Sequence, residues 1–254
     1  TIGAHKSVAA YDINYYFPLY LYPTIDQQDL FVYHETSERK PNLNPSFVAA
    51  LTAAYGTAPT PEDFFNYIYA VLYAPAYRTK YAEFLRMDFP RIPFTADAKL
   101  FRMLATLGEK LVALHLLKSP ELDPPACRFE GEGDGRVCKD RKNGLRYDAA
   151  EERVYINSAQ HFAPVPDSVW NYQVGGYQVC EKWLKDRKER RLELDDIRTY
   201  CRIVTALART IELQQQIDAF YSEAERDTVA LTPKAEETKA KKPIGSTRRR
   251  PRRA

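Results

Sequence analysis

"LDPPACRFEGEGDGRVCKDRKNGLRYDAAEERVYIN", residues 122–157, differs in character from the chain on either side of it. It contains two adjacent prolines, four glycines and four short segments in which apolar and polar residues alternate: ACRFE, RVCKD, GLRYD and RVYIN. Alternation with a period of two between turn residues predicts short antiparallel strands. With a further strand expected in VWNYQV (169–174), the sequence predicts a β-rich part at about 122–174.

The chain before this stretch carries helix signals. In "TPEDFFNYIYAVLYAP" (60–75), Thr60 can cap a helix, Pro61 suits its first turn, and Asp63 lies three residues after the cap. Apolar residues then recur at helical spacing. We expect further helices over 45–56, 76–88 and about 96–118, with the proline-rich FPRIPF (89–94) as a rigid bend. Together they predict a helical part at about 45–120.

Helix signals return after the β-rich part. YQVCEKWLKDRK (177–188) predicts one helix, and a long helix capped by Asp195 or Asp196 is expected to end near Asp218. These form the C-terminal helices, about 177–220, and the aromatic segment 11–23 predicts one or two short strands. Helices on both sides of a small, mainly antiparallel sheet predict an α+β fold over residues 1–228.

The net charge of +3 belongs to the C-terminal end of the chain. Residues 234–254 hold nine of the 37 basic and two of the 34 acidic residues, so residues 1–233 have 28 basic and 32 acidic residues. We expect residues 229–254 to be a disordered basic tail, because their composition cannot bury enough apolar surface. The tail either adds salt-sensitive affinity for phosphates or is a solvated extension.

Motifs of catalysis and metal binding are scarce. The sequence has no G-x-x-x-x-G-K-[ST], G-x-S-x-G or H-E-x-x-H motif, and its four cysteines form no C-x-x-C pair. We expect no catalytic and no metal-binding residues, reduced cysteines, and a buried or surface role for His115. No signal peptide and no apolar run near eighteen residues occurs, which predicts a cytoplasmic protein without a membrane partner.

Two short motifs resemble functional sites, but their residues argue against those functions. GEGDG (131–135) looks like a phosphate-binding loop, but Glu132 and Asp134 would repel a phosphate, so a hairpin turn is expected. DPPA (123–126) is similar to the Asp/Asn-Pro-Pro-aromatic motif of amino-methyltransferases. Ala126 replaces the aromatic residue that stacks on a flipped base, so we expect a proline-rich loop.

"YQVGGYQVCEKWLKDRKERRL", residues 172–192, concentrates positive charge after a glycine pair. Glycines allow close approach or positive φ, a helix start at Tyr177 and Gln178 favours anions, and glutamine can pair with adenine. The alternative is a solvated helix face with Trp183 and Leu184 packed inward. The candidate DNA-contacting residues are Gly175, Gly176, Tyr177, Gln178, Lys182, Lys185, Arg187 and Lys188, with Arg78, Lys80 and Arg91 as a second set.

Several long segments together resemble one known family. They are YFPLYLYP (16–23), YIYAVLYAPAYRTKYAEFLRMDFPRIPF (67–94), LATLGEKLVALHLLKSP (104–120), RVYIN (153–157) and residues 169–218. In this order they resemble the C-terminal specificity region, the target recognition domain, of Type ISP restriction–modification enzymes. The resemblance covers nearly all of residues 15–220.

The resemblance implies a fragment of a larger enzyme. The family joins a nuclease, a translocase ATPase, an adenine-N6 methyltransferase and a target-recognition region in one prokaryotic polypeptide for phage defence, and this chain resembles only the last. It would read double-stranded DNA and present the target adenine to the methyltransferase region. S-adenosylmethionine, ATP and Mg²⁺ are expected elsewhere in the parent polypeptide and no cofactor in this chain. The alternatives are a helical docking scaffold for other regions of the parent and a catalytic methyltransferase or nuclease remnant.

Overall fold

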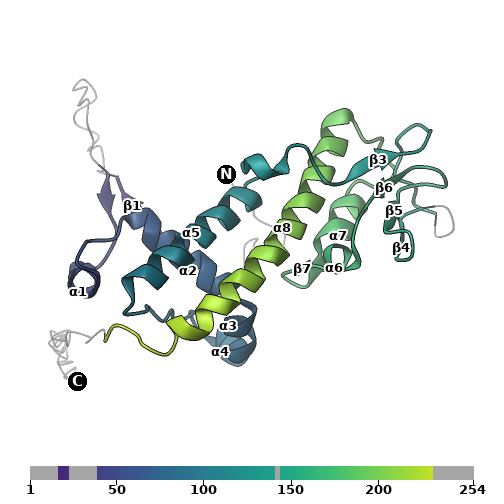
Figure 1. Cartoon of the computed structure of the whole chain (residues 1–254). Helices are drawn as coiled ribbons and strands as arrows, with labels where there is room; N and C mark the ends of the chain where they lie inside the picture. The colour runs from purple at the N-terminus through teal and green to yellow at the C-terminus, as the bar shows by residue number, and fades with distance from the viewer. Residues whose placement is uncertain (1–16, 23–38, 141–143, 231–254) are drawn as a thin grey trace, which may run out of the picture.

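The computed structural model describes residues 17–22, 39–140 and 144–230, and the fold is α+β as predicted (Figure 1). Helices on one side of the molecule are joined by one long helix to a small antiparallel sheet on the other side. The predicted tail lies outside the described residues except for 229 and 230, as do residues 11–16 and 23 of the predicted N-terminal strands. Within that segment, β1 (Tyr20–Leu21) pairs with β2 (Lys40–Pro41).

The helical part begins with α1 (Pro45–Tyr55) and α2 (Pro61–Tyr73), followed by α3 (Pro75–Lys80), α4 (Ala82–Met87) and α5 (Ala98–His115). The predicted capping box of Thr60 and Asp63 starts α2. The single helix expected over 76–88 is wrong, because the backbone at Tyr81 leaves the helical conformation and separates α3 from α4. Helices α2 and α5 pack closely at Gly108, where an added Cβ would lie 1.9 Å from the carbonyl oxygen of Asn66.

The four-stranded sheet is built from β3 (Arg128–Glu130), β4 (Arg146–Asp148), β5 (Arg153–Tyr155) and β6 (His161–Ala163) in the order β3-β6-β5-β4, all antiparallel. Strands β3, β4 and β5 lie in three of the four segments predicted from alternation. The prediction for RVCKD was wrong: this segment contributes only a bridge between Arg136 and Arg191. Strand β6 was not predicted.

The GEGDG segment does not form the expected hairpin turn. Strand β3 pairs with β6 rather than with the residues that follow the turn. Instead the segment is fastened to a buried amide, since the backbone N–H of Gly135 donates to Oε1 of Gln160 at 2.8 Å. Asn157 supports the same amide, with its Nδ2 donating to Oε1 of Gln160 at 2.9 Å. Side chains from the 157–160 turn therefore decide the path of this loop.

The chain then forms α6 (Asp167–Trp170), the hairpin strands β7 (Gln173–Val174) and β8 (Tyr177–Gln178), and α7 (Val179–Lys185). The strand expected over 169–174 is therefore helical in its first half. The last helix, α8 (Leu194–Ala224), has 31 residues and extends past the predicted end at Asp218. Its cap is Glu193 rather than Asp195 or Asp196, and Asp196 completes a reciprocal capping box with it.

Two clusters of buried hydrophobic residues fill the molecule, and α8 contributes to both. The helical core contains residues of α1, α2, α3 and α5 together with Leu213, Ile217 and Tyr221 of α8. The β-rich core contains residues of the sheet, α6 and α7 together with Tyr200 and Val204 of α8. In Figure 1, α8 runs from the sheet to the helices. A single helix thus fixes the two parts relative to each other.

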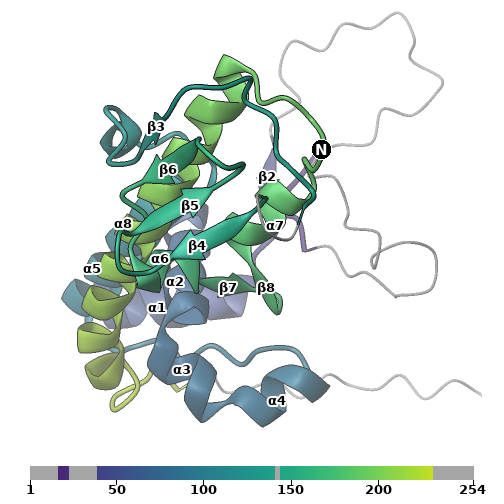
Figure 2. The same cartoon turned by 90° about the vertical axis from the view of Figure 1, so that its right-hand side faces the viewer.

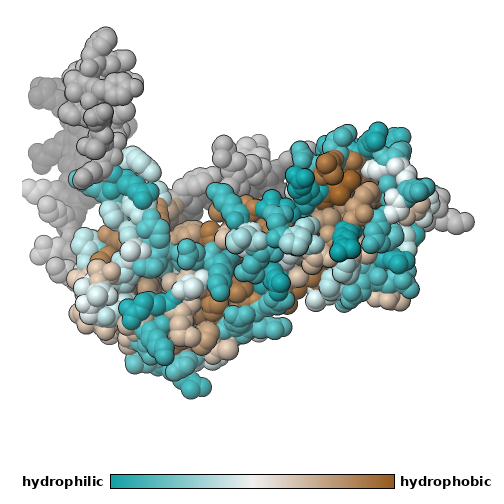
Figure 3. Space-filling model, turned by 45° about the horizontal axis from the view of Figure 1, so that its top comes forward, coloured by the Kyte–Doolittle hydropathy of each residue, from teal (hydrophilic) through white to brown (hydrophobic). Residues whose placement is uncertain are grey.

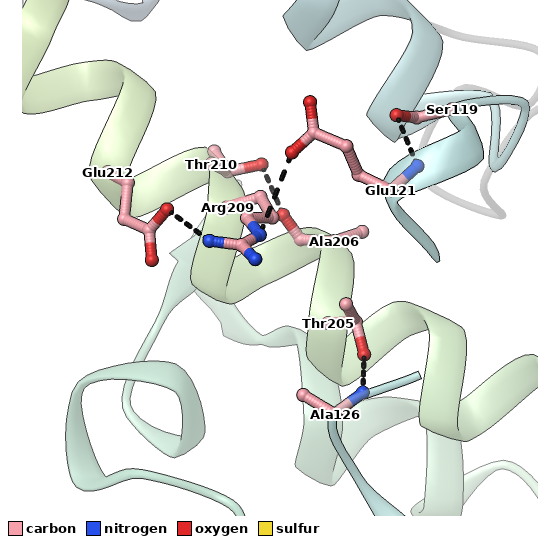
Figure 4. Close-up of polar contacts among 8 residues, drawn as sticks. All are labelled: Ser119, Glu121, Ala126, Thr205, Ala206, Arg209, Thr210 and Glu212. Carbon is pink, nitrogen blue, oxygen red and sulfur yellow. Dashed lines mark hydrogen bonds and ion pairs between the residues drawn. The ribbon is translucent and has the colours of Figure 1, made fainter. Parts of the chain in front are cut away.

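The connection from α5 to β3 is also fastened to α8 (Figure 4). It includes the 3-10 helix η2 (Pro120–Leu122) and the DPPA motif. The backbone N–H of Ala126 donates to Oγ1 of Thr205 at 3.0 Å, and Glu121 lies 3.6 Å from Arg209 in an ion pair. In this structure the DPPA segment is a loop, as expected, and its contacts are with a helix of its own chain.

The surface is mainly hydrophilic on the face shown in Figure 3, with hydrophobic residues in separate patches. Cys127, Cys180 and Cys201 are buried free thiols, and Cys138 is half-buried. Among the described residues, no helix is both long enough and apolar enough to cross a membrane.

His115 lies where α2, α5 and α8 meet. Its Nδ1 is 2.7 Å from the hydroxyl of Tyr69, and its Nε2 is 3.0 Å from Oγ1 of Thr210. Because the Thr210 hydroxyl donates to the carbonyl of Ala206, it accepts from Nε2–H, and Nδ1 accepts from Tyr69. Burial lowers the pKa of His115. The residue therefore serves as a neutral, hydrogen-bonded core histidine, which is one of the two non-catalytic roles expected from the sequence.

Acidification is expected to weaken the fold through His115. A histidine whose folded-state pKa is lowered contributes stability above its unfolded pKa of about 6.5, and that contribution is lost as the pH falls. Between pH 7.5 and pH 5.5 the wild type should lose more free energy of unfolding than His115→Gln does, as measured by urea unfolding at each pH. Equal losses in the two proteins would contradict this assignment.

Candidate nucleic-acid interface

The glycine pair forms the turn of a two-residue β-hairpin. Val174 of β7 faces Tyr177 of β8, with Gly175 and Gly176 between them at φ values of 58° and 81°. Positive φ at both central residues is the geometry of a type I′ turn, which favours glycine. A Cβ added at either position would meet nothing within 4 Å. The backbone conformation therefore requires the glycines, and the space around the turn is open.

The hairpin lies between β4 and the α3–α4 pair in Figure 2, and its residues are exposed except for the half-buried Gln178. Because side chains alternate across a strand, Gln173 and Gln178 share one face and Val174 and Tyr177 share the other. Val174 is 48% exposed and Tyr177 is 51% exposed. The hairpin thus presents a polar face and an apolar face to the surroundings.

The expectation that Tyr177 and Gln178 begin a helix was wrong. They form β8, and α7 starts at Val179. The first helical N–H is already used, since Val179 donates to the carbonyl of Tyr172 at 3.1 Å. Cys180 and Leu184 of α7 are buried in the β-rich core. The start of α7 therefore anchors the hairpin to the core, and its first amide is not available to an anion.

Lys182 and Lys185 lie on α7 and have partners on the same chain segment. Lys182 pairs with Asp186, and Nζ of Lys185 lies 2.7 Å from Glu181. These lysine side chains are 36% and 45% exposed. Exposed pairs of this kind contribute about 0–1 kcal/mol, so a phosphate could replace the carboxylate at little cost.

Arg187 has contacts inside the fold. Its guanidinium carbon lies 3.5 Å from the ring centroid of Trp183, and its Nε lies 3.2 Å from Oδ1 of Asp196. Asp196 also accepts the backbone N–H of Glu193, the capping residue of α8. Arg187 therefore ties the end of α7 to the start of α8, and its side chain is only 24% exposed.

The connector between α7 and α8, residues 186–193, carries the exposed cations Lys188, Arg190 and Arg191. Its backbone pairs with residues 135–137: Glu189 donates to the carbonyl of Val137 at 2.8 Å, and Val137 donates to the carbonyl of Arg190 at 3.0 Å. The Glu189 side chain accepts from Arg136 at 3.2 Å. This ladder holds the three cations on a defined edge of the β-rich part.

The structure places the three residues of the second predicted set, Arg78, Lys80 and Arg91, in different surroundings. Arg78 lies close enough to Tyr172, at the base of the hairpin, that its positive charge partly offsets the rise in the pKa of Tyr172 caused by burial. Lys80 pairs with Glu225 at 2.8 Å, beyond the end of α8. Arg91 is exposed in the 89–94 bend. Of this set, the structure brings Arg78 next to the glycine hairpin.

The structure adds three candidates to the contacts predicted from the sequence: Gln173, Arg190 and Arg191. Gln173 belongs to the first Tyr-Gln-Val copy, and its position opposite Gln178 follows from the hairpin register. Gly-Gly between two Tyr-Gln-Val copies is itself a hairpin signal that predicts this register. Arg190 and Arg191 end the basic run, and only the ladder with residues 135–137 distinguishes them from the cations of α7. Among the described residues, no cluster of His, Cys, Asp and Glu could hold a metal ion.

Comparisons with known proteins identify relatives of the whole arrangement. The family model described as the Type ISP C-terminal specificity domain matches residues 4–216. The structure of a DrdV–DNA complex is similar with a TM-score of 0.55 and 25% identity, over 79% of this chain and 21% of that chain. The ATP-dependent Type ISP restriction–modification enzyme LlaBIII bound to DNA is similar with a TM-score of 0.57 and 20% identity, over 79% of this chain and 14% of that chain. No curated protein matches the chain.

The contacts of Arg187 predict a stabilising role for this side chain. Arg187→Ala should lower the free energy of unfolding by about 1–3 kcal/mol, because it removes a cation–π contact, a hydrogen bond to the partly buried Asp196 carboxylate and a hydrogen bond to the carbonyl of Trp183. Lys188→Ala, the neighbouring exposed cation, should change it by less than about 0.5 kcal/mol. Thermal or urea unfolding of the two variants measures the difference, and equal effects would mean that Arg187 does not stabilise the connector.

Proposed function

The chain belongs to the family of Type ISP C-terminal specificity domains, and we propose that it recognises double-stranded DNA by inserting the β7–β8 hairpin into the major groove. The observation that carries this proposal is the exposed type I′ hairpin, which is followed after α7 by a run of exposed cations. The major groove is about 12 Å wide and admits a two-stranded ribbon. Both solved relatives above are described as DNA complexes.

The cations would grip the phosphates on either side of the groove. Helix α7 has seven residues and is therefore about 10 Å long, which separates the hairpin from the connector by a distance comparable with the groove width. Lys188, Arg190 and Arg191 would contact one backbone, and Arg78 at the hairpin base would contact the other. Lys182 and Lys185 could exchange their carboxylates for phosphates, whereas Arg187 would position the connector.

The chemistry would be supplied by other parts of a longer polypeptide. The chain spans 14% to 21% of the length of the solved relatives. In this proposal the domain reads the site and presents the target adenine to a methyltransferase region of the parent. S-adenosylmethionine, ATP and Mg²⁺ would bind in the parent's other regions.

A second function, docking onto another region of the parent, is favoured by one observation. Phe84, Met87 and Phe89 are 66%, 75% and 53% exposed around α4, at a cavity of about 360 Å³ that is lined by aromatic, aliphatic and proline residues together with Asp88 and Arg91. Exposed apolar patches of this kind mark interaction sites. A recognition domain must also contact its methyltransferase, so the two functions are compatible on different surfaces.

A triple variant tests the DNA-binding proposal. Lys188→Gln, Arg190→Gln and Arg191→Gln together should weaken binding to all duplex sequences and reduce the slope of log affinity against log salt by about 0.9 for each phosphate that is no longer neutralised. The matched control replaces Lys99, Arg102 and Lys110 of α5 with glutamine, which removes the same charge from another exposed face. Fluorescence anisotropy with a labelled duplex at several salt concentrations measures both slopes. If the two triple variants lose affinity and slope equally, the site assignment is wrong.

Calorimetry distinguishes a DNA recognition domain from a catalytic methyltransferase remnant. We expect no heat of binding when S-adenosylmethionine is titrated into the chain, because the proposal assigns that cofactor to another region of the parent. Saturable heat with a defined stoichiometry would instead favour a methyltransferase remnant.

A further inference from the structure

Glutamine occurs at two positions of the hairpin, and the two side chains differ in their contacts. Gln173 and Gln178 are cross-strand partners, each from one copy of Tyr-Gln-Val. The fold places them on one face of the ribbon, directly opposite each other. Either amide could therefore reach a base edge if this face of the hairpin met the floor of a groove.

Gln178 is held by the protein. Its Nε2 donates to Oδ1 of Asn171 at 2.9 Å, and Nδ2 of Asn171 donates to Oδ1 of Asp167 at 2.9 Å. This chain of side chains connects β8 to both ends of α6. Gln178 is also half-buried. Its amide donor therefore fixes the orientation of the hairpin.

Gln173 is exposed, and within the described part of the chain its side chain has no hydrogen-bond partner. A glutamine amide presents one donor and one acceptor side by side, which match N7 and N6 of adenine in the major groove. The open space around Gly175 and Gly176 permits the turn to approach the groove floor closely. The exposed amide thus has the chemistry and the access that adenine readout requires.

We propose that Gln173 reads one adenine of the target sequence in the major groove, while Gln178 is a positioning residue that holds the ribbon. The inference rests on the proposed DNA-binding function and adds the base and the residue that recognises it. Of the two glutamines, the sequence analysis named only Gln178 as a candidate contact, and the hydrogen bond that holds Gln178 favours the exposed Gln173 for base reading instead.

The substitution Gln173→Glu tests the inference, because a carboxylate accepts from N4 of cytosine instead of pairing with adenine. The full 254-residue chain is used to select duplexes from a randomised library, and the selected sequences are determined. The wild type should prefer adenine at one position of its motif, and Gln173→Glu should shift that position towards cytosine. Gln173→Ala should reduce discrimination at the same position by about tenfold without changing the others.

Gln178→Ala is the matched control. It should lower the melting temperature and weaken discrimination at the position that Gln173 reads, because the ribbon is held less firmly, but the same base should remain preferred at every position. Both Gln173 variants should melt as the wild type does. If the wild type selects a motif and Gln173→Glu selects the same motif, the inference is wrong and the proposed function still stands. A preferred base that differs between Gln178→Ala and the wild type also overturns the inference. A wild type that binds no duplex overturns the proposed function as well.

Discussion

The packing of α8 against both hydrophobic cores is the constraint on which the rest of the structure depends. The helix has 31 residues and is therefore about 46 Å long, enough to cross both parts of the molecule. Tyr200 and Val204 face the β-rich core, and Leu213 and Ile217 face the helical core. Polar contacts fasten the middle, where Nε2 of Gln214 donates to the carbonyl of Tyr73 and His115 contacts Thr210. Because one rigid element serves both cores, Arg78 and the hairpin keep a fixed spacing although they come from different parts of the fold.

The sequence predicted those elements whose signals lie within a few residues. Thr60 and Asp63 started α2 as expected, because a capping box is complete within four residues. Strand β6 was missed because its three residues carry no alternation long enough to detect, and its position depends on β3, more than thirty residues earlier. The path of GEGDG was missed for the same reason, since a buried Gln160 holds it from a distant turn. Pairing between distant segments depends on which residues are buried and on which hydrogen-bond partners their amide groups find. A local sequence pattern gives neither.

The candidate site shows the same division. The sequence identified the basic run and gave positive φ as one of two possible roles for Gly175 and Gly176, because charge and backbone freedom are local properties. It could not separate the cations of the connector, because their roles depend on contacts made in the fold. Arg187 is held by Asp196 of α8, and the connector is fixed by Glu189, which accepts the backbone N–H of Lys139 fifty residues earlier. A run of like charges therefore predicts that a surface is basic, whereas only the fold distinguishes the charges that hold the surface together from those that remain exposed.

This separation has a consequence for how such a domain can change its target. The hairpin is anchored through Cys180 and Leu184 of α7 and through the Gln178–Asn171 hydrogen bond, while the side chain of Gln173 is exposed. Substitutions at the exposed position alter no buried contact, so they cost little folding free energy. Substitutions at the anchoring positions would disturb packing before they altered any base contact. If the hairpin reads DNA as proposed, a new specificity is therefore most accessible through the exposed positions of the ribbon. In that proposal α8, Arg187 and the core of α7 hold these positions in register with the exposed cations of the connector.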